Sequence, residues 1–284
     1  MVIVSYRCES LLRNCLASLR RHPPLRPMQV SVVDNASQDG TAEMVAREFP
    51  EVELTVNDRN EGFAAANNKA IRSARAPSVL VLNPDTEVTE GALESMLEVL
   101  EGKPEIAVCG PRLELSGGGL DHAAKRSFPT PVSALGHFSG TGRRPGARGK
   151  LAEYRAPDVE NGPVDAVNGA CMLIRRSALD RVGLFDEGFW MYMEDLDLCY
   201  RLRQAGWLTW YEPSATVIHV KAGTSGPIRN PRLNRAFHYG MYRFYRKHYA
   251  AAHNPLFNGM IYAGIGLKLL TSVPASAIIR AARR

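Results

Sequence analysis

Short apolar segments alternate with amphipathic segments along the first 110 residues, and this alternation constrains the fold more than any other feature. Apolar, strand-like runs cover residues 1–5, 30–33, 52–56, 79–82 and 106–109. Helical spacing of apolar residues covers residues 9–21, 41–49, 62–75 and 89–101, the last with Thr89 as its expected N-cap. Strands that alternate with helices predict an α/β fold whose mostly parallel sheet is covered by helices on both faces.

Polar residues follow three of these strands at the point where each one ends. They are Ser5 and Tyr6, then Asp34 and Asn35, then the sequence Asn83-Pro84-Asp85. In doubly wound sheets, ligands bind beyond the carboxyl ends of the strands. We therefore expect these three strand ends to converge on one binding site.

Composition and charge fit a globular protein that is not built around disulfides. The chain has 284 residues and a formal net charge of +6, which suits phosphate-bearing ligands or an anionic membrane surface. Its five cysteines are scattered and form no CxxC pair, so neither a zinc site nor a disulfide scaffold is indicated. We expect a reducing, cytoplasmic location, no signal peptide before the first strand, and no nucleic-acid partner.

The second half of the chain is less regular. Residues 116–163 are rich in Gly, Pro, Arg and Ser, and they are expected to form a long excursion over the active face. Regular structure is expected again at 164–175 and 186–206, followed by a strand pair around Glu212-Pro213 that ends at His219. A basic, aromatic helix is expected at 233–249.

Two acidic residues at strand ends are candidates for ligand binding. Asp34 can accept hydrogen bonds from a nucleobase or a ribose hydroxyl, although it could equally cap the turn that follows it. Asp85 can hold a divalent cation that neutralises a diphosphate, although a Pro–Asp turn is the simpler explanation of this motif. The loop from Asn60 to Asn68 leads into a helix whose backbone NH groups attract phosphate, or it serves only tight helix packing.

The sequence Glu194-Asp195-Leu196-Asp197 combines three carboxylates with an aromatic approach. In a helix, Glu194, Asp197 and Arg201 share a face, whereas Asp195 points elsewhere and could act as a general base. A solvated acidic first turn is the alternative. His219 could bind a metal or a diphosphate, although a lone histidine is more often structural.

Together the motifs resemble the inverting family 2 glycosyltransferases of the GT-A fold, especially bacterial rhamnosyltransferase-type members. The matching segments are residues 2–6, 32–41, 60–64, 82–85, 168–175, 183–187 and 194–199. The resemblance implies a Rossmann-like, doubly wound mixed sheet with a C-terminal helical extension. It also implies a glycosyltransferase domain at 1–225, with a donor half at 1–115 and an acceptor half at 116–225, and a helical, membrane-associating region at 226–284.

The same resemblance assigns roles to individual residues. Asp195 is expected to be the catalytic base, and Asp85 and His219 to hold Mg²⁺ or Mn²⁺. Donor binding is expected of Val4, Ser5, Tyr6, Asp34, Asn60, Gly62, Asn67, Asn83 and Asp85. Acceptor binding is expected of Gly169, Trp190 and Glu194. The DxD metal motif reads Asn83-Pro84-Asp85 here, so one carboxylate is replaced by an amide.

The expected reaction moves a sugar from a dTDP- or UDP-linked donor to a saccharide hydroxyl, with dTDP-rhamnose as the first candidate and a polyprenyl-diphosphate-linked acceptor. Galactofuranosyl and mannosyl transfer are alternatives. A non-catalytic nucleotide- or carbohydrate-binding protein is the alternative of a different class, and a nucleotidyltransferase is disfavoured because residues 5–14 lack a glycine- and basic-rich phosphate loop.

The tail, residues 255–284, is apolar with a cationic end. It could pack on the domain, lie on a membrane surface or span a membrane. An interfacial helix would place the enzyme on the inner face of the cell membrane. A homo-oligomer is also compatible with the sequence.

Overall fold

The computed structural model describes residues 1–131, 159–220 and 230–281. Its first half contains β1 (Val2–Ser5), α1 (Glu9–Arg21), β2 (Ser31–Asp34), α2 (Thr41–Glu48), β3 (Glu53–Val56), α3 (Phe63–Ser73), β4 (Ser78–Leu82), β5 (Thr86–Val88), α4 (Ala92–Gly102) and β6 (Ile106–Leu115). Its second half contains β7 (Lys125–Arg126), β8 (Gly162–Val164), β9 (Ala166–Val167), β10 (Cys171–Arg175), α6 (Arg176–Val182), α7 (Glu194–Gln204), β11 (Leu208–His219), α8 (Pro231–His248) and α9 (Pro255–Ala281).

Within the described residues the main sheet has the strand order β3-β2-β1-β4-β10-β6-β11-β5, and β8 pairs with β11 outside this path. Strands β3, β2, β1 and β4 run parallel to one another. Strand β10 is antiparallel to both β4 and β6, and β11 is parallel to β6 but antiparallel to β5. The prediction of a doubly wound, mixed α/β sheet is therefore confirmed.

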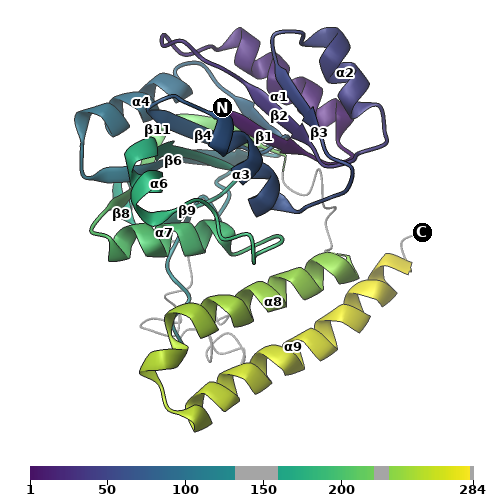
Figure 1. Cartoon of the computed structure of the whole chain (residues 1–284), viewed down its shortest axis with the longest axis vertical. Coiled ribbons are helices and arrows are strands. Elements are labelled where there is room, and N and C mark those ends of the chain that lie inside the picture. Colours follow the sequence, from purple (N-terminus) through teal and green to yellow (C-terminus); the bar gives the residue numbers. More distant parts are fainter. Residues whose placement is uncertain (132–158, 221–229, 282–284) are drawn as a thin grey trace.

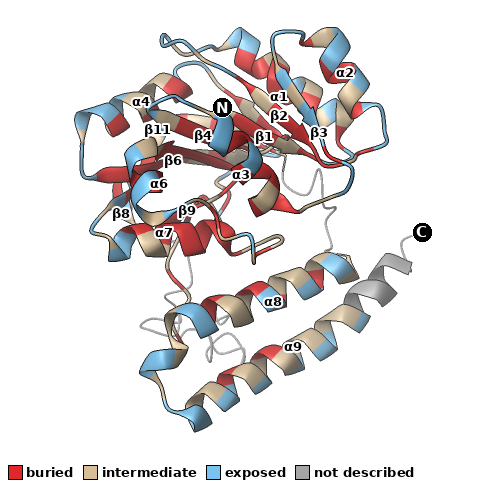
Figure 2. Ribbon diagram, in the orientation of Figure 1, coloured by how far each residue is buried: buried red, intermediate tan, exposed pale blue. Residues whose placement is uncertain are grey.

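Alternating apolar side chains build a separate core on each face of the sheet. In β4, Leu80 and Leu82 pack into the core that contains α1, α2 and α4, whereas Val79 and Val81 pack with α3, α6 and α7. This strict alternation is the expected result of the two-residue period of a strand. Figures 1 and 2 show the two helical layers and the buried residues concentrated between them and the sheet.

Two local predictions were wrong. Residues 86–88 form β5, a strand that was not predicted, and the following helix begins at Ala92 after Gly91 in a left-handed conformation. Thr89 is therefore no N-cap, and its hydroxyl instead donates to the carbonyl of Thr216 in β11 at 2.7 Å. The expected strand pair around Glu212-Pro213 is one strand, β11, whose register with β6 shifts between Glu212 and Thr216.

The chain ends in a helical hairpin that lies beside the α/β body. In Figure 1, α8 lies between that body and α9. Ile261 and Ile265 of α9 pack against Tyr245 of α8 in a small core of their own. The predicted boundary between residues 225 and 226 falls outside the described residues, and much of the predicted excursion at 116–163 does as well. Because β10 and β11 complete the same sheet as β1–β6, the predicted donor and acceptor halves share one sheet.

Candidate active site

The three polar strand ends lie at one edge of the sheet, as predicted. Ser5 of β1 is in register with Asp34 of β2, and Ile3 of β1 with Leu82 of β4. The Ser5 hydroxyl donates to Asp34 Oδ1 at 2.9 Å, and both residues are buried. Tyr6 follows Ser5 and is 37% exposed, so of these two predicted pocket residues only Tyr6 is accessible to solvent.

Asp34 organises the turn that follows it. Its carboxylate accepts the backbone NH of Ser37 at 2.9 Å and also the Ser37 hydroxyl. The next residue, Asn35, donates its side-chain amide to the carbonyl of Gly62 at 3.0 Å. These contacts give Asp34 the turn-capping role that the sequence left open, and they connect the turn to the loop before α3.

Gly62 holds that loop directly against Trp190. The Phe63 NH donates to the Trp190 carbonyl at 2.8 Å. Gly62 has a φ of +90°, and a Cβ atom there would lie 2.3 Å from the Trp190 carbonyl oxygen. A residue predicted to bind the donor therefore contacts a residue predicted to bind the acceptor, and only glycine fits between them.

The other polar residues of this loop are mostly engaged in local structure. The Asn60 side chain accepts the NH of Gly62 at 3.0 Å. Asn67 is fully buried in α3 and donates to the carbonyl of Phe63 at 2.9 Å. The Asn67 side chain, predicted to contact the donor, is therefore not exposed to a ligand in this structure.

Asp85 and His219 meet because β5 pairs with the end of β11. His219 is in register with Thr86, and the NH of Val220 donates to the Asp85 carbonyl at 2.8 Å. Asp85 Oδ1 and His219 Nε2 lie 3.7 Å apart, and both side chains are buried. The second ring nitrogen, Nδ1, lies 3.0 Å from Oδ2 of Asp121, a fully buried residue that the sequence analysis missed.

The Asp85–His219 pair fits a shared divalent cation. Protein ligands lie about 2.0–2.2 Å from Mg²⁺ or a similar ion, so one ion can bridge two ligand atoms that are 3.7 Å apart. In the part of the chain that the structure describes, no three His, Cys, Asp or Glu residues are grouped closely enough to hold an ion. The remaining ligands would therefore have to come from water or from a bound diphosphate.

Asp195 lies at the start of α7, after a backbone turn of unusual conformation. Tyr192 and Met193, immediately before the helix, have φ values of +71° and +73°, a left-handed conformation that costs free energy for residues other than glycine. The Gly169 NH donates to Asp195 Oδ2 at 2.9 Å, and the Leu196 NH donates to Oδ1 at 2.8 Å. The carboxylate is thus held in one orientation.

Arg126 of β7 forms an ion pair with Asp195, which the sequence did not predict. Its guanidinium lies 2.5 Å from Asp195 Oδ2 and also donates to the carbonyl of Val167 at 2.7 Å. The side chain of Asp195 is only 9% exposed. Asp195 is therefore less free than its place on the helix suggested, although it does point away from Asp197.

A short hydrogen-bonded path connects the two ends of the site. The Asn83 NH donates to the carbonyl of Ala170 at 2.8 Å. The neighbouring Gly169 donates to Asp195, as described above. One backbone–backbone hydrogen bond and one bond from the Gly169 NH to a side chain thus join the Asn83–Asp85 segment to the carboxylate of Asp195, because β4 and β10 are adjacent strands.

Glu194 is buried next to Asp195. Burial, and next the negative charge of Asp195, raise the pKa of the Glu194 carboxyl far above its ordinary value. Its Oε2 atom has no hydrogen-bond partner among the described residues. With its pKa raised to about 8, the protonated form of Glu194 is favoured at pH 7, and a protonated carboxyl can donate a hydrogen bond to a ligand.

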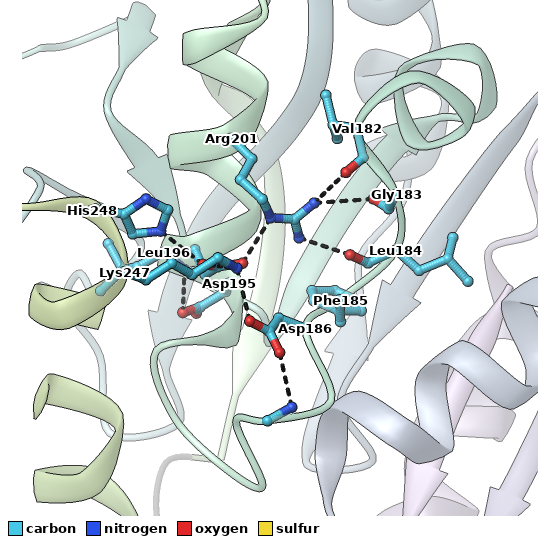
Figure 3. A network of polar contacts seen from close by, with 12 residues as sticks. Val182, Gly183, Leu184, Phe185, Asp186, Asp195, Leu196, Arg201, Lys247 and His248 are labelled. Carbon is cyan, nitrogen blue, oxygen red and sulfur yellow. Dashed lines mark hydrogen bonds and ion pairs between the residues drawn. The ribbon is translucent and has the colours of Figure 1, made fainter. Parts of the chain in front are cut away.

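The opposite face of α7 is connected to α8 by a network of charges (Figure 3). Asp197 is fully buried and lies 2.7–2.8 Å from Arg201, Lys247 and His248. Burial alone would raise the pKa of Asp197, but the hydrogen bonds from these three residues and the positive charge of Arg201 outweigh it and lower that pKa. The predicted shared face of Asp197 and Arg201 is confirmed by their ion pair at 2.8 Å.

Helix α8 also contacts the loop that carries Trp190. Lys247 and Arg243 both form ion pairs with Asp186, at 2.7 and 2.8 Å. The guanidinium of Arg232 lies 4.2 Å from the centre of the Trp190 ring. The predicted acceptor loop is therefore held between α3 on one side and α8 on the other.

A cavity of about 370 Å³ lies elsewhere, lined by Ser127, Pro163, Val164, Asp165, Arg203, Trp207, Leu208 and Thr209. None of the predicted site residues lines it. We therefore place the candidate active site at the strand ends and not in this cavity.

Comparison with known proteins identifies the family of the chain. The model of the family described as glycosyl transferase family 2 matches residues 1–183. The N-acetylglucosaminyl-diphospho-decaprenol L-rhamnosyltransferase of Mycobacterium tuberculosis is 33% identical over 255 residues, which cover 84% of this chain and 80% of the relative. The rhamnosyltransferase WbbL of Escherichia coli is 32% identical over 167 residues, which cover 56% of this chain and 60% of the relative.

Solved structures support the fold at lower identity. A mannosyltransferase of Pyrobaculum calidifontis in complex with GDP-Man and Mn²⁺ aligns with a TM-score of 0.59 at 18% identity, over 99% of this chain and 73% of that one. GalNAc-T7 with UDP, GalNAc and Mn²⁺ aligns with a TM-score of 0.57 at 17% identity, over 77% of this chain and 43% of that one.

Proposed function

The chain belongs to glycosyl transferase family 2, and from this premise we propose that it is an inverting, metal-dependent hexosyltransferase. The observation that carries the proposal is the backbone path described above, which joins the Asp85–His219 end of the site to the carboxylate of Asp195. A metal-binding group and a base that are fixed relative to each other suit a reaction in which a diphosphate leaves while a hydroxyl attacks.

In the proposed reaction, the acceptor hydroxyl attacks the anomeric carbon of the donor sugar and loses its proton to Asp195. The bond between that carbon and the diphosphate oxygen breaks, and the nucleoside diphosphate leaves with the electron pair. Displacement in one step inverts the anomeric carbon. Asp85 and His219 would hold Mg²⁺ or Mn²⁺, which when bound neutralises charge on the diphosphate.

The hydrogen bonds of Asp195 support Oδ1 as the oxygen that would receive the proton. Among the described residues, Oδ2 accepts from both Gly169 and Arg126, whereas Oδ1 accepts from Leu196 alone. Each carboxylate oxygen offers about two lone pairs. Oδ1 therefore keeps one for the acceptor hydroxyl, and Arg126 and Gly169 fix the orientation of the carboxylate.

We further propose L-rhamnose, carried by dTDP, as the donor sugar and a polyprenyl-diphosphate-linked saccharide as the acceptor. The printed names of two relatives, both rhamnosyltransferases, one of them acting on a decaprenol-linked sugar, support this choice. Cell-wall or surface polysaccharide synthesis is the corresponding process. Galactofuranosyl and mannosyl donors are the alternatives that a donor screen must include.

The exposed side of α9 supports a location at the inner membrane surface. Within the described residues, one helical segment, Pro255–Pro274, is long and apolar enough to cross a membrane, and only 11% of it is buried. Its exposed residues include Leu256, Met260, Leu267 and Leu270, which are 53–79% exposed, and none of its exposed positions is charged. A packing helix would bury this surface, so we propose that α9 contacts lipid.

The test is a transfer assay with purified protein, Mn²⁺ or Mg²⁺, and a bacterial lipid extract as the acceptor source. Parallel reactions contain dTDP-rhamnose, a UDP-galactofuranose donor or GDP-mannose. Loss of general-base help costs about 10² to 10⁴-fold, so Asp195→Asn should lose at least 100-fold of donor-saturated turnover while it still binds the donor. Turnover within a few-fold of the wild type would exclude Asp195 as the base, and no transfer from any donor would refute the proposed activity.

A further inference from the structure

Asp121 is a buried carboxylate that lies against the predicted metal ligand His219. It belongs to the connection between β6 and β7, and it is fully buried. Its backbone is fixed at both ends, since its NH donates to the Leu113 carbonyl and its carbonyl accepts from Ala124, each at 2.8 Å. The NH of Ala123 donates to its Oδ1 at 3.0 Å, which leaves Oδ2 directed at His219.

The contact between Asp121 and His219 determines which ring nitrogen carries hydrogen. Asp121 Oδ2 lies 3.0 Å from His219 Nδ1. An ionised carboxylate only accepts hydrogen bonds, so Nδ1 must be the donor in this contact. In the neutral imidazole the hydrogen then resides on Nδ1, and Nε2 presents a lone pair.

That lone pair faces the second carboxylate, Asp85. The Nε2–Oδ1 distance of 3.7 Å is too long for a hydrogen bond. Two electron-rich atoms at this separation in a buried setting suit a cation between them. The carboxylate–histidine–metal arrangement has the same pattern, in which an outer carboxylate orients the ligating ring and raises its basicity.

We propose that Asp121 is a positioning residue that fixes the tautomer and ring orientation of His219, so that Nε2 binds a divalent cation shared with Asp85 and the diphosphate of the donor. This inference rests on the proposed function for the identity of the diphosphate. Asp121 does not bind the ion itself, because it occupies the ring nitrogen on the other side of the imidazole.

A purely structural role for Asp121 makes different predictions. In that case the chain Asp121–His219–Asp85 would only stabilise the packing of β6, β11 and β5. Substitution of Asp121 would then lower thermal stability without a specific change in metal affinity. The two roles are separated by measuring metal binding in variants that remain folded.

The experiment measures Mn²⁺ binding by electron paramagnetic resonance, in the presence of saturating dTDP or UDP as the probe. Asp121→Asn should weaken Mn²⁺ binding about 10 to 100-fold, the usual effect of removing an outer partner of a metal ligand. In a His219→Ala background, Asp121→Asn should have no further effect, because its role operates through His219. Asp180→Asn, at an exposed position of α6, is the matched control and should bind Mn²⁺ like the wild type.

Each outcome decides one question. If the wild type binds no Mn²⁺ with nucleotide, the metal-dependent function itself fails. If the wild type and the Asp121→Asn variant bind Mn²⁺ equally well, the positioning role is refuted. It is also refuted if Asp121→Asn weakens Mn²⁺ binding to the same extent in the wild-type and His219→Ala backgrounds. Should Asp121→Asn not fold, ¹⁵N NMR of the wild-type histidine rings decides: hydrogen on Nδ1 of metal-free His219 supports the proposal, and hydrogen on Nε2 overturns it.

Discussion

Substitution of Gly62 by alanine should separate the two loops of the active site and lower catalysis strongly. A Cβ atom at this position would lie 2.3 Å from the Trp190 carbonyl oxygen and 2.5 Å from its ring atom Cδ1. Ordinary contact between such atoms requires about 3.5 Å, so one loop must move by about 1 Å. The positive φ of Gly62 adds a backbone cost of about 1–3 kcal/mol for any other residue.

The expected loss of activity follows from this displacement. A misplacement of about 1 Å can reduce catalysis about 10²-fold even when it arises away from the reacting atoms. Gly62→Ala should therefore reduce kcat/KM for sugar transfer about 100-fold. The assay measures transfer at several donor and acceptor concentrations, together with the melting temperature of each variant.

Gly206→Ala provides the matched control. Gly206 has a φ of +88°, close to that of Gly62, but a Cβ atom there would meet no other atom within 4 Å. This variant should lose stability but keep its activity. If Gly62→Ala retains activity within three-fold of Gly206→Ala, the contact between Gly62 and Trp190 does not position the catalytic groups, and the reasoning is refuted.

Two further predictions concern the buried charge on α7 and the exposed side of α9. Asp197→Asn should destabilise the fold by about 3 kcal/mol at pH 7, because it removes the fully buried carboxylate charge that pairs with Arg201 and Lys247 and accepts from His248. Since the folded-state pKa of Asp197 is lowered, its stabilisation is complete above the unfolded value of about 3.9 and is lost as the pH falls below it. Urea unfolding should show the difference between variant and wild type shrinking below pH 4, and an equal difference at every pH would contradict this account. The double variant Leu267→Glu/Leu270→Glu should abolish co-sedimentation with anionic vesicles but leave the melting temperature nearly unchanged, because both side chains are exposed; unchanged sedimentation would exclude lipid contact through this surface.

The sheet and the strand-end residues could be predicted because their signals are local. The helical spacing at residues 9–21 corresponds to α1, and Ser5 and Asp34 end adjacent strands as expected. Strand β5 was missed because three residues after a Pro–Asp turn carry too little periodicity to identify a strand. Likewise, Glu212-Pro213 predicted a break between two strands, but β11 continues through these residues with a shift in its register with β6.

Asp121 and Arg126 could not be predicted for a different reason. Both lie in a segment without periodicity, and each acts on a partner about 70 to 100 positions away in the sequence, His219 for Asp121 and Asp195 for Arg126. A single charged residue in an irregular segment carries no local sign of such a partner. Only the folded chain brings the connection between β6 and β7 to both the proposed metal-binding end and the proposed base end of the site.

The backbone path from Asn83 through Ala170 and Gly169 to Asp195 also affects how such a protein can diversify. In the proposed mechanism, the separation between the groups that would handle the leaving diphosphate and the attacking hydroxyl is set by main-chain pairing of β4 and β10. In the proposed mechanism, side-chain changes on the loop of Trp190 that keep its contact with Gly62 should therefore alter which acceptor is admitted without moving the reacting centre. Engineering of new acceptor preferences should begin at that loop and at the facing side of α8, and should leave β4 and β10 unchanged.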